Sequence, residues 1–224
     1  MIGLRKGERM NAVIAEIKVY SPKYGDLLRN RDVIDILEVY ERCRCAGISY
    51  ITEKNYFRGD FEIFRRICRN SELPVLRKDF IVTKEEIEKT AEAEGSAVLL
   101  IARILKENTA EFVDYSIDHG LESIVEVHSI GDIDYALESK TPIIGINNRD
   151  IAILEKDDGS VKVTEKLAPL INSHATKISE SGIQTKRDVE MALEYVDAIL
   201  VGTAFMRAEN IEKKVMEFVG GENA

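Results

Sequence analysis

The fold is decided by the stretch from Ala97 to Asn147, which reads AVLLIARILKENTAEFVDYSIDHGLESIVEVHSIGDIDYALESKTPIIGIN. Three short apolar runs lie in it, Ala97–Ile101, Glu122–Val127 and Pro142–Asn147, and the segments between them are longer and amphipathic. Apolar runs of this length predict buried strands. Strict alternation of strand and helix predicts a parallel sheet with right-handed crossovers.

The same unit recurs on both sides of this stretch. The other predicted strands are Ala12–Ile17, Ile48–Thr52, Pro74–Lys78, Thr176–Glu180 and Ala198–Gly202. Eight nearly equal units favour closure into a barrel over an open sheet, and no linker or change in composition marks a second domain. We therefore expect residues 1–224 to form a single α/β domain, a (β/α)8 barrel.

Helical spacing of apolar residues supports this interpretation between and after the strands. The i, i+3, i+4, i+7 pattern, or a close variant of it, is present in Val33, Ile36, Leu37 and Tyr40, in Val189, Ala192, Leu193 and Val196, and in Ile211, Val215, Phe218 and Val219.

Strand alternation predicts which side chains point into the barrel. One apolar layer is predicted from Ile14, Leu76, Ile124 and Ile178. Two residues further along the same strands, a charged layer is predicted from Glu16, Lys78, Glu126 and Glu180. Buried charges are costly unless they are paired or hydrated. Four of them at the carboxyl ends of barrel strands therefore indicate an active site.

The residue types in this layer suit acid–base chemistry. A partly desolvated Lys78 can donate a proton near neutral pH, although a structural ion pair is the alternative. Lys18 can pair with a substrate carboxylate or lie in solvent on the rim. Glu126 and Glu180 can shuttle protons or anchor hydroxyl groups. Asn147 can bind a hydroxyl group or simply form a turn.

A phosphate site is predicted in the loops after the last two strands. Ser181 and Gly182 follow one strand, and Gly202 and Thr203 follow the next. In such barrels these loops often bind phosphate through backbone N–H groups, and glycine allows a close approach. Ser21, just after the first strand, can add a hydroxyl contact, although Ser-Pro is also a turn signal.

His128 shares the inward face with Glu126, and a place lining the mouth and a solvated place on the rim are equally good interpretations. The spacing of histidines, cysteines and carboxylates does not suggest a metal site, and there is no dinucleotide fingerprint. We therefore expect no metal or organic cofactor.

The composition of the chain limits the classes of partner that it is expected to bind. A net charge of −9 and a pI near 5.1, without a basic block, argue against nucleic acid and anionic membranes. The longest apolar run is too short for a membrane span, and Met1–Met10 lacks the apolar core of a signal peptide. Cys43, Cys45 and Cys68 lie in segments of helical pattern and fit buried thiols in a reducing cytoplasm. We expect a cytoplasmic protein, a monomer or weak homodimer, that binds a phosphorylated small molecule.

At these residues the sequence resembles the indole-3-glycerol-phosphate synthase family, from about Ile14 to Met206. The resemblance is carried by Ala15-Glu16-Ile17-Lys18 with Ser21-Pro22, Leu76-Arg77-Lys78-Asp79-Phe80-Ile81-Val82, Val98-Leu99-Leu100-Ile101, Glu126-Val127-His128, Gly145-Ile146-Asn147-Asn148-Arg149-Asp150, Ser179-Glu180-Ser181-Gly182-Ile183 and Gly202-Thr203-Ala204-Phe205-Met206. Each segment lies at the tip of a predicted strand. The chain departs from the family in having few residues before the first strand, which suggests a truncated N-terminal extension, and in Thr203 where serine is commoner.

The resemblance implies a lyase of tryptophan biosynthesis that closes the indole ring of a carboxyphenylamino-deoxyribulose phosphate, with loss of carbon dioxide and water. It implies Lys78 as the general acid and Lys18 as the partner of the substrate carboxylate. Glu126 would assist dehydration, with Glu16 and Asn147 positioning hydroxyl groups and Glu180 orienting the lysines and substrate. The phosphate would be bound by Ser21, Ser181, Gly182, Gly202 and Thr203.

Two other functions compete with this one. Phosphoribosylanthranilate isomerase is a similar barrel, but it relies on a cysteine at a strand tip, where this sequence has lysines. A non-catalytic or diverged barrel that binds a sugar phosphate is the second, although a mere binder gains little from desolvating Glu16, Lys18, Lys78 and Glu126.

Overall fold

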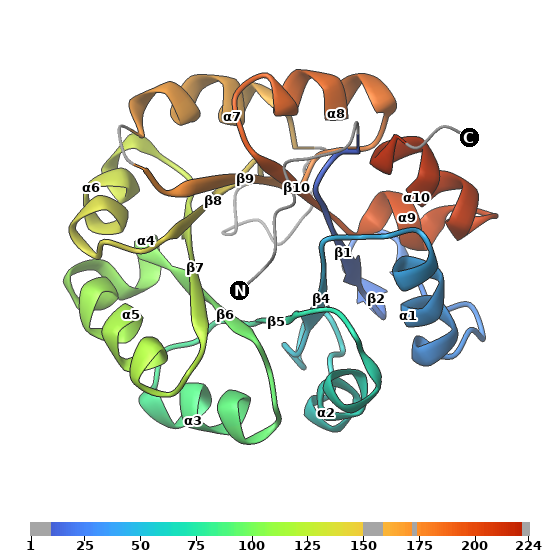
Figure 1. Ribbon diagram of the computed structural model, residues 1–224, viewed down its shortest axis with the longest axis horizontal. Coiled ribbons are helices and arrows are strands. Elements are labelled where there is room, and N and C mark those ends of the chain that lie inside the picture. The colour runs from blue at the N-terminus through green and yellow to red at the C-terminus, as the bar shows by residue number, and fades with distance from the viewer. Residues whose placement is uncertain (1–9, 150–158, 172–173, 221–224) are drawn as a thin grey trace.

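A computed structural model describes the protein at residues 10–149, 159–171 and 174–220. Eight parallel strands close into a barrel in the order β1-β10-β9-β8-β7-β6-β5-β4, and helices surround it (Figure 1). The strands are β1 Val13–Ile17, β4 Gly47–Ile51, β5 Val75–Lys78, β6 Ala97–Ile101, β7 Glu122–Val127, β8 Ile143–Asn147, β9 Thr176–Glu180 and β10 Ala198–Val201. All eight predicted strands are confirmed, with ends that shift by no more than one residue.

Helices connect the strands in the manner predicted. They are α1 Val33–Arg42, α2 Phe61–Asn70, α3 Lys84–Glu92, α4 Ala102–Leu105, α5 Thr109–Asp118, α6 Ile130–Glu138, α7 Lys162–Leu167, α8 Lys186–Leu193, α9 Thr203–Arg207 and α10 Ile211–Val219, with the 3-10 turns η1 Lys106–Asn108 and η3 Ala168–Leu170. Among the described helices, none is both long and apolar enough to cross a membrane. A small antiparallel pair, β2 Tyr20–Ser21 and β3 Gly25–Asp26, lies outside the barrel and was not predicted.

Local chemistry fixes where several helices begin. Asp32 and Asp60 accept hydrogen bonds from backbone N–H groups in the first turns of α1 and α2. Thr185 and Asp188 form a reciprocal capping box at the start of α8. The buried faces of α1 and α10 match the predicted apolar sets. In α8 the prediction ran too far, because the helix ends at Leu193 and the buried Val196 lies in the loop beyond it.

The core has two parts, one inside the barrel and one between the strands and the helices. The predicted apolar layer is confirmed, because Ile14, Leu76, Ile124 and Ile178 all belong to the inner cluster. The outer cluster contains the largest buried aromatic side chains, which are Tyr40, Tyr50, Phe64, Phe205 and Phe218. This packing holds the strand tips rigidly, as a catalytic site at the barrel mouth requires.

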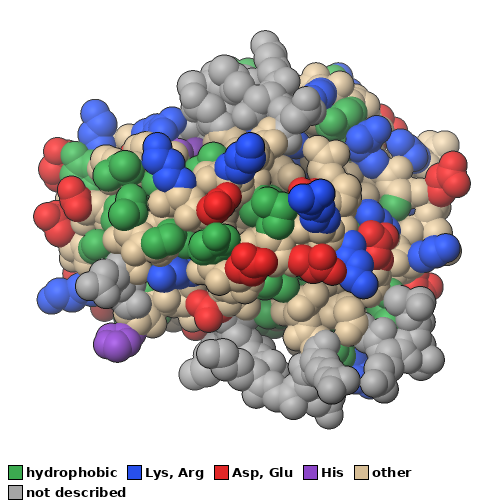
Figure 2. Space-filling model, turned by 90° about the horizontal axis from the view of Figure 1, so that it is seen from above, with side chains coloured by type: hydrophobic (Ala, Val, Ile, Leu, Met, Phe, Trp, Pro, Cys, Tyr) green, Lys and Arg blue, Asp and Glu red, His purple; other side chains and the backbone are tan. Residues whose placement is uncertain are grey.

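The cysteines are free thiols. Cys43 and Cys45 are buried just after α1 rather than within a helix, which corrects the sequence-based placement, and Cys68 is half-buried in α2. On the face seen in Figure 2, acidic and basic side chains are interspersed, so the net negative charge is not gathered there into a patch of one sign.

Candidate active site at the carboxyl ends of the strands

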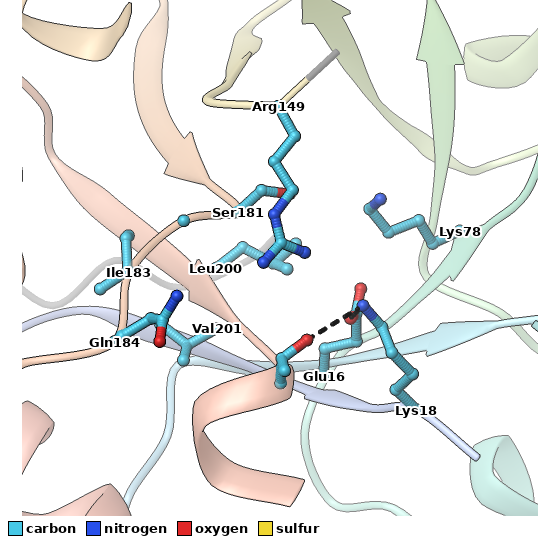
Figure 3. Close-up of a pocket in the computed structure, with 12 residues that line it drawn as sticks. Glu16, Lys18, Lys78, Arg149, Ser181, Ile183, Gln184, Leu200 and Val201 are labelled. Carbon is cyan, nitrogen blue, oxygen red and sulfur yellow. Dashed lines mark hydrogen bonds and ion pairs between the residues drawn. The ribbon is translucent and has the colours of Figure 1, made fainter. Parts of the chain in front are cut away.

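One cavity opens at the carboxyl ends of the strands (Figure 3). It is lined by Glu16, Lys18, Lys78, Arg149, Ser181, Gly182, Ile183, Gln184, Leu200, Val201, Gly202 and Thr203. The empty space inside it is about 380 Å³ when the open mouth is included. Three cationic side chains in this lining make it a site for an anionic ligand.

The tip of β1 supplies a buried ion pair to this cavity. Lys18 Nζ lies 3.2 Å from Glu16 Oε1, and both residues are 3 % exposed. The same ammonium donates to Thr203 Oγ1 over 3.4 Å (Figure 3) and lies 5.6 Å from the centre of the Phe57 ring. The adjacent Gly202 leaves space for this pair, because a Cβ atom there would lie 2.3 Å from Glu16 Oε1.

The tips of β5, β7 and β8 form the second group. Lys78 Nζ lies 4.0 Å from Glu126 Oε2, and Asn147 Nδ2 donates to the same oxygen over 3.0 Å. Asn147 Oδ1 accepts from the backbone N–H of Arg149, and this contact fixes which end of the amide faces Glu126. The lysine therefore approaches a carboxylate whose orientation is already set.

Glu126 and Glu180 are two fully buried carboxyl groups whose pKa values are shifted in opposite directions. Burial would raise the pKa of Glu126, but the charges of His128 and Lys78 and two side-chain hydrogen bonds outweigh it and lower that pKa to about 2. Burial, followed by the charge of Glu126, raises the pKa of Glu180 well above its ordinary value. As the pH falls, Glu180 is therefore protonated before Glu126.

Gly145 makes room for the second of these carboxyl groups. A Cβ atom at this position on β8 would lie 2.0 Å from Glu180 Oε1 and 3.2 Å from a methyl carbon of Ile124. Any larger residue would displace the Glu180 side chain, so the glycine is required by the close approach of β9's last side chain.

Asn148 ties the tip of β8 to the loop after β9. Its Nδ2 donates to Ser179 Oγ, Glu180 O and Ser181 O over 2.9, 3.1 and 3.0 Å, and its Oδ1 accepts from the N–H and hydroxyl groups of Thr164. The loop that it supports has left-handed backbone at Ser181 (φ 65°) and Gly182 (φ 70°). From the sequence, no role was predicted for this side chain.

The structure brings most of the predicted residues together. Those that line the cavity are Glu16, Lys18, Lys78, Ser181, Gly182, Gly202 and Thr203. The predicted residues that lie buried near Lys78 but do not line the cavity are Glu126, Asn147 and Glu180. Ser21 is different: it is fully buried in β2, its hydroxyl accepts from the backbone N–H of Lys23, and it is not among the lining residues.

Arg149 is a charged residue of the cavity for which the sequence analysis predicted no role. It is 6 % exposed, and its guanidinium points into the cavity toward Ser181 and Leu200 (Figure 3). It was quoted only as part of a motif, because it follows the strand and the alternation rule does not extend into a loop. Within the described ranges, no group of three or more histidines, cysteines or carboxylates could bind a metal ion.

Comparison with known proteins finds the same family along nearly the whole chain. The family model described as indole-3-glycerol phosphate synthase matches residues 3–218. The chain is similar to the indole-3-glycerol phosphate synthase of Pyrococcus abyssi, with 59% identity over 93% of this chain and 91% of that relative. It is also similar to the proteins of the same name from Thermococcus kodakarensis, with 56% identity over 96% and 95% of the two chains, and from Pyrococcus furiosus, with 55% identity over 98% and 96%.

Proposed function

Because the chain belongs to the indole-3-glycerol phosphate synthase family, we propose that the cavity between Lys18, Lys78 and the loops after β9 and β10 is where it closes the indole ring. The activity itself is that of the family: a carboxyphenylamino-deoxyribulose phosphate loses carbon dioxide and water as the new ring forms. The isomerase and the non-catalytic barrel are not favoured, since the relatives that cover most of the chain carry the synthase name.

Lys78 is the general acid in this proposal. Its ammonium faces the cavity (Figure 3) and is only partly exposed, and it can protonate the substrate ketone as the aromatic ring attacks it. Glu126, 4.0 Å away and ionised, keeps the ammonium in place and can take up the proton that leaves during dehydration. The pairing with Glu126 is the observation that carries the proposal.

The anionic groups of the substrate have separate partners. Lys18 and Arg149 present charges to the cavity, and we assign the substrate carboxylate to Lys18, with Arg149 as a second cation. Backbone N–H groups and hydroxyls of Ser181, Gly182, Gly202 and Thr203 are assigned to the phosphate. Ser21 is retained as a more distant member of this set, which acts through the conformation of the segment around Lys23.

The remaining polar residues position the sugar hydroxyls and the lysines. Glu16 holds Lys18 at 3.2 Å, and Asn147 holds Glu126 at 3.0 Å. Glu180 was expected to orient the lysines and the substrate. Since its pKa is raised, we assign it instead the role of a neutral hydrogen-bond donor in the resting site.

We extend the proposal to the organisation of the protein. Residues 1–224 are proposed to form one catalytic domain, which acts in the cytoplasm as a monomer or weak homodimer. Free thiols suit a reducing compartment. Sedimentation analysis at increasing concentrations tests the oligomeric state.

Indole fluorescence tests the assignment of Lys78. The chain has no tryptophan, so indole emission that appears after mixing with substrate reports product alone. Lys78→Ala is expected to bind substrate and to lose turnover by a factor of about 100 to 10,000. Lys84→Ala, which removes a surface lysine paired with Glu111, is the matched control and should turn over normally. Normal turnover by the Lys78 variant would rule out the assignment.

A further inference from the structure

His128 lies against the carboxylate that pairs with Lys78. Its side chain is 2 % exposed, and its Nε2 atom lies 3.1 Å from Glu126 Oε1. The sequence left open whether this histidine faces solvent or the barrel mouth, and the structure places it in the buried site. Both ring nitrogens are buried, and Nε2 is the one that lies within hydrogen-bond distance of the Glu126 carboxylate.

The backbone of His128 is fixed by the helix that follows it. Asp132 in α6 accepts hydrogen bonds from the N–H groups of His128 and Ser129 over 2.8 and 2.9 Å. Arg103 of α4 in turn lies 3.7 Å from the same Asp132 oxygen. These contacts therefore fix the backbone between β7 and α6 in the position that places the imidazole next to Glu126.

The charged and polar groups around Glu126 divide between its two oxygens. Asn147 from β8 and Lys78 from β5 approach Oε2, and His128, the residue directly after β7, approaches Oε1. Glu180 on β9 faces the same carboxylate as a like group, with Glu16 of β1 beyond it. Removing the imidazole would leave Oε1 buried beside other carboxyl groups, without the cation or N–H donor that offsets burial.

We propose that His128 is a positioning residue for the ring-closing reaction: it holds Glu126 ionised and turned so that Oε2 faces Lys78 and Asn147. This inference rests on the proposed function of Lys78 and Glu126. Ionised Glu126 can accept a proton, whereas a neutral Glu126 cannot, and a carboxyl group without a charged partner in a buried site tends toward the neutral form.

Substitutions of matched geometry separate this role from simple space filling. The amide nitrogen of glutamine is as many bonds from Cα as the imidazole Nε2, whereas that of asparagine corresponds to Nδ1. His128→Gln therefore keeps a donor for Glu126 Oε1, while His128→Asn and His128→Leu do not. His119→Leu is the control, because that histidine is exposed at the end of α5 and contacts only Tyr115 O among the hydrogen bonds of its ring.

The decisive measurement is the pH dependence of kcat and KM for these variants, with indole fluorescence as the readout of product. His128→Leu and His128→Asn should lose kcat at least about tenfold at the acidic end of the range, with the acidic limb moved to higher pH and KM little changed. His128→Gln should move the limb back toward that of the wild type, because it supplies the donor but not the charge. The proposal is wrong if the acidic limb of folded His128→Leu stays at its wild-type position. It is also wrong if the glutamine and asparagine variants have the same pH profile. If the leucine variant does not fold, the glutamine and asparagine pair decides.

A second measurement needs no turnover, so it distinguishes failure of this inference from failure of the proposed function. The chain has three histidines, so imidazole nitrogen NMR signals can be assigned by substitution. Glu126→Gln should shift the His128 signals and leave those of His119 and His174 unchanged. If all three stay the same, His128 does not interact with Glu126 and the inference fails. Wild-type protein that produces no indole would instead contradict the proposed function.

Discussion

The carboxyl group of Glu180 fills the space that a side chain at Gly145 would need: Oε1 lies 2.0 Å from the position of a Cβ atom there. The two residues face each other across neighbouring strands, because Gly145 pairs with Ile178 in the β8–β9 register and Glu180 is two residues further along β9. The absence of a side chain on one strand therefore decides where a carboxyl group on the next can lie.

Gly145→Ala should reduce kcat/KM by about 100-fold, because a displacement of about 1 Å in a catalytic group has an effect of that size. The protein should remain folded. Gly131→Ala in α6 is the control, since the nearest atom to its Cβ is 3.9 Å away and alanine favours helix. Steady-state kinetics and thermal unfolding of both variants check this. Wild-type kinetics in Gly145→Ala would contradict it.

Glu180→Gln should gain stability relative to the wild type as the pH rises. A carboxyl whose pKa is raised on folding binds more protons in the folded state above its ordinary value of 4.5, so its contribution to stability falls with increasing pH up to the folded value. Glutamine does not ionise, so the stability of the variant does not fall with pH for this reason. Urea unfolding at about pH 5 and about pH 8 measures the difference. A difference that does not change with pH would show that Glu180 is not protonated in the folded protein.

Glu126 has the opposite dependence. Its pKa falls from 4.5 to about 2 on folding, so its contribution is complete above 4.5 and is lost as the pH falls toward 2. Glu126→Gln should therefore be less stable than the wild type at neutral pH, with the gap closing in acid. The same unfolding series, extended to low pH, tests this. A gap that widens in acid would be the contrary result.

Asn148→Asp should disrupt the junction between β8 and the loop after β9. A carboxylate has no N–H to donate, so it would face Ser179 Oγ and the carbonyls of Glu180 and Ser181 without hydrogen bonds. We expect a loss of about 2 to 4 kcal/mol in unfolding free energy and a higher KM. Ser160→Ala, in the neighbouring segment, is the control. Unfolding and KM are measured together, and an unaltered KM would separate Asn148 from phosphate binding.

Arg77→Met should destabilise the fold by about 3 to 5 kcal/mol, because it breaks a buried charge network behind β5. The Arg77 guanidinium donates to Thr52 Oγ1, Thr90 Oγ1 and Glu86 O, and lies 3.2 Å from Asp79 Oδ2. Arg66→Met, which removes an exposed pair with Asp32, should cost less than about 1 kcal/mol. Equal effects in denaturant titrations would show that the buried network does not stabilise the strand tip.

The strands and their inward faces could be predicted because each is governed by a local rule. A run such as Ala97–Ile101 is too short and too apolar to be anything but a buried strand between helices, and its bounds are confirmed. Period-two alternation then placed Ile124 and Glu126 on the inner face of β7.

Features beyond the strand ends could not be obtained from these rules. Asn148 and Arg149 follow β8 in a loop. The direction of the Asn148 side chain depends on contacts with Thr164 and the β9 tip, both distant in sequence. The raised pKa of Glu180 depends first on its burial in the closed barrel and then on the nearby charge of Glu126, and not on its own neighbours in the chain. The β2–β3 pair is only two residues on each side, which is below the length at which a pattern is visible.

Closure of the barrel between β1 and β10 has a consequence for synthesis on the ribosome. The contact between Lys18 and Thr203 joins residues 185 positions apart, and β10 is the last strand to emerge. A nascent chain therefore has no complete catalytic pocket until nearly all of it has been translated, since closing this longest loop comes last. Onset of enzyme activity on stalled ribosomes would time that final closure directly.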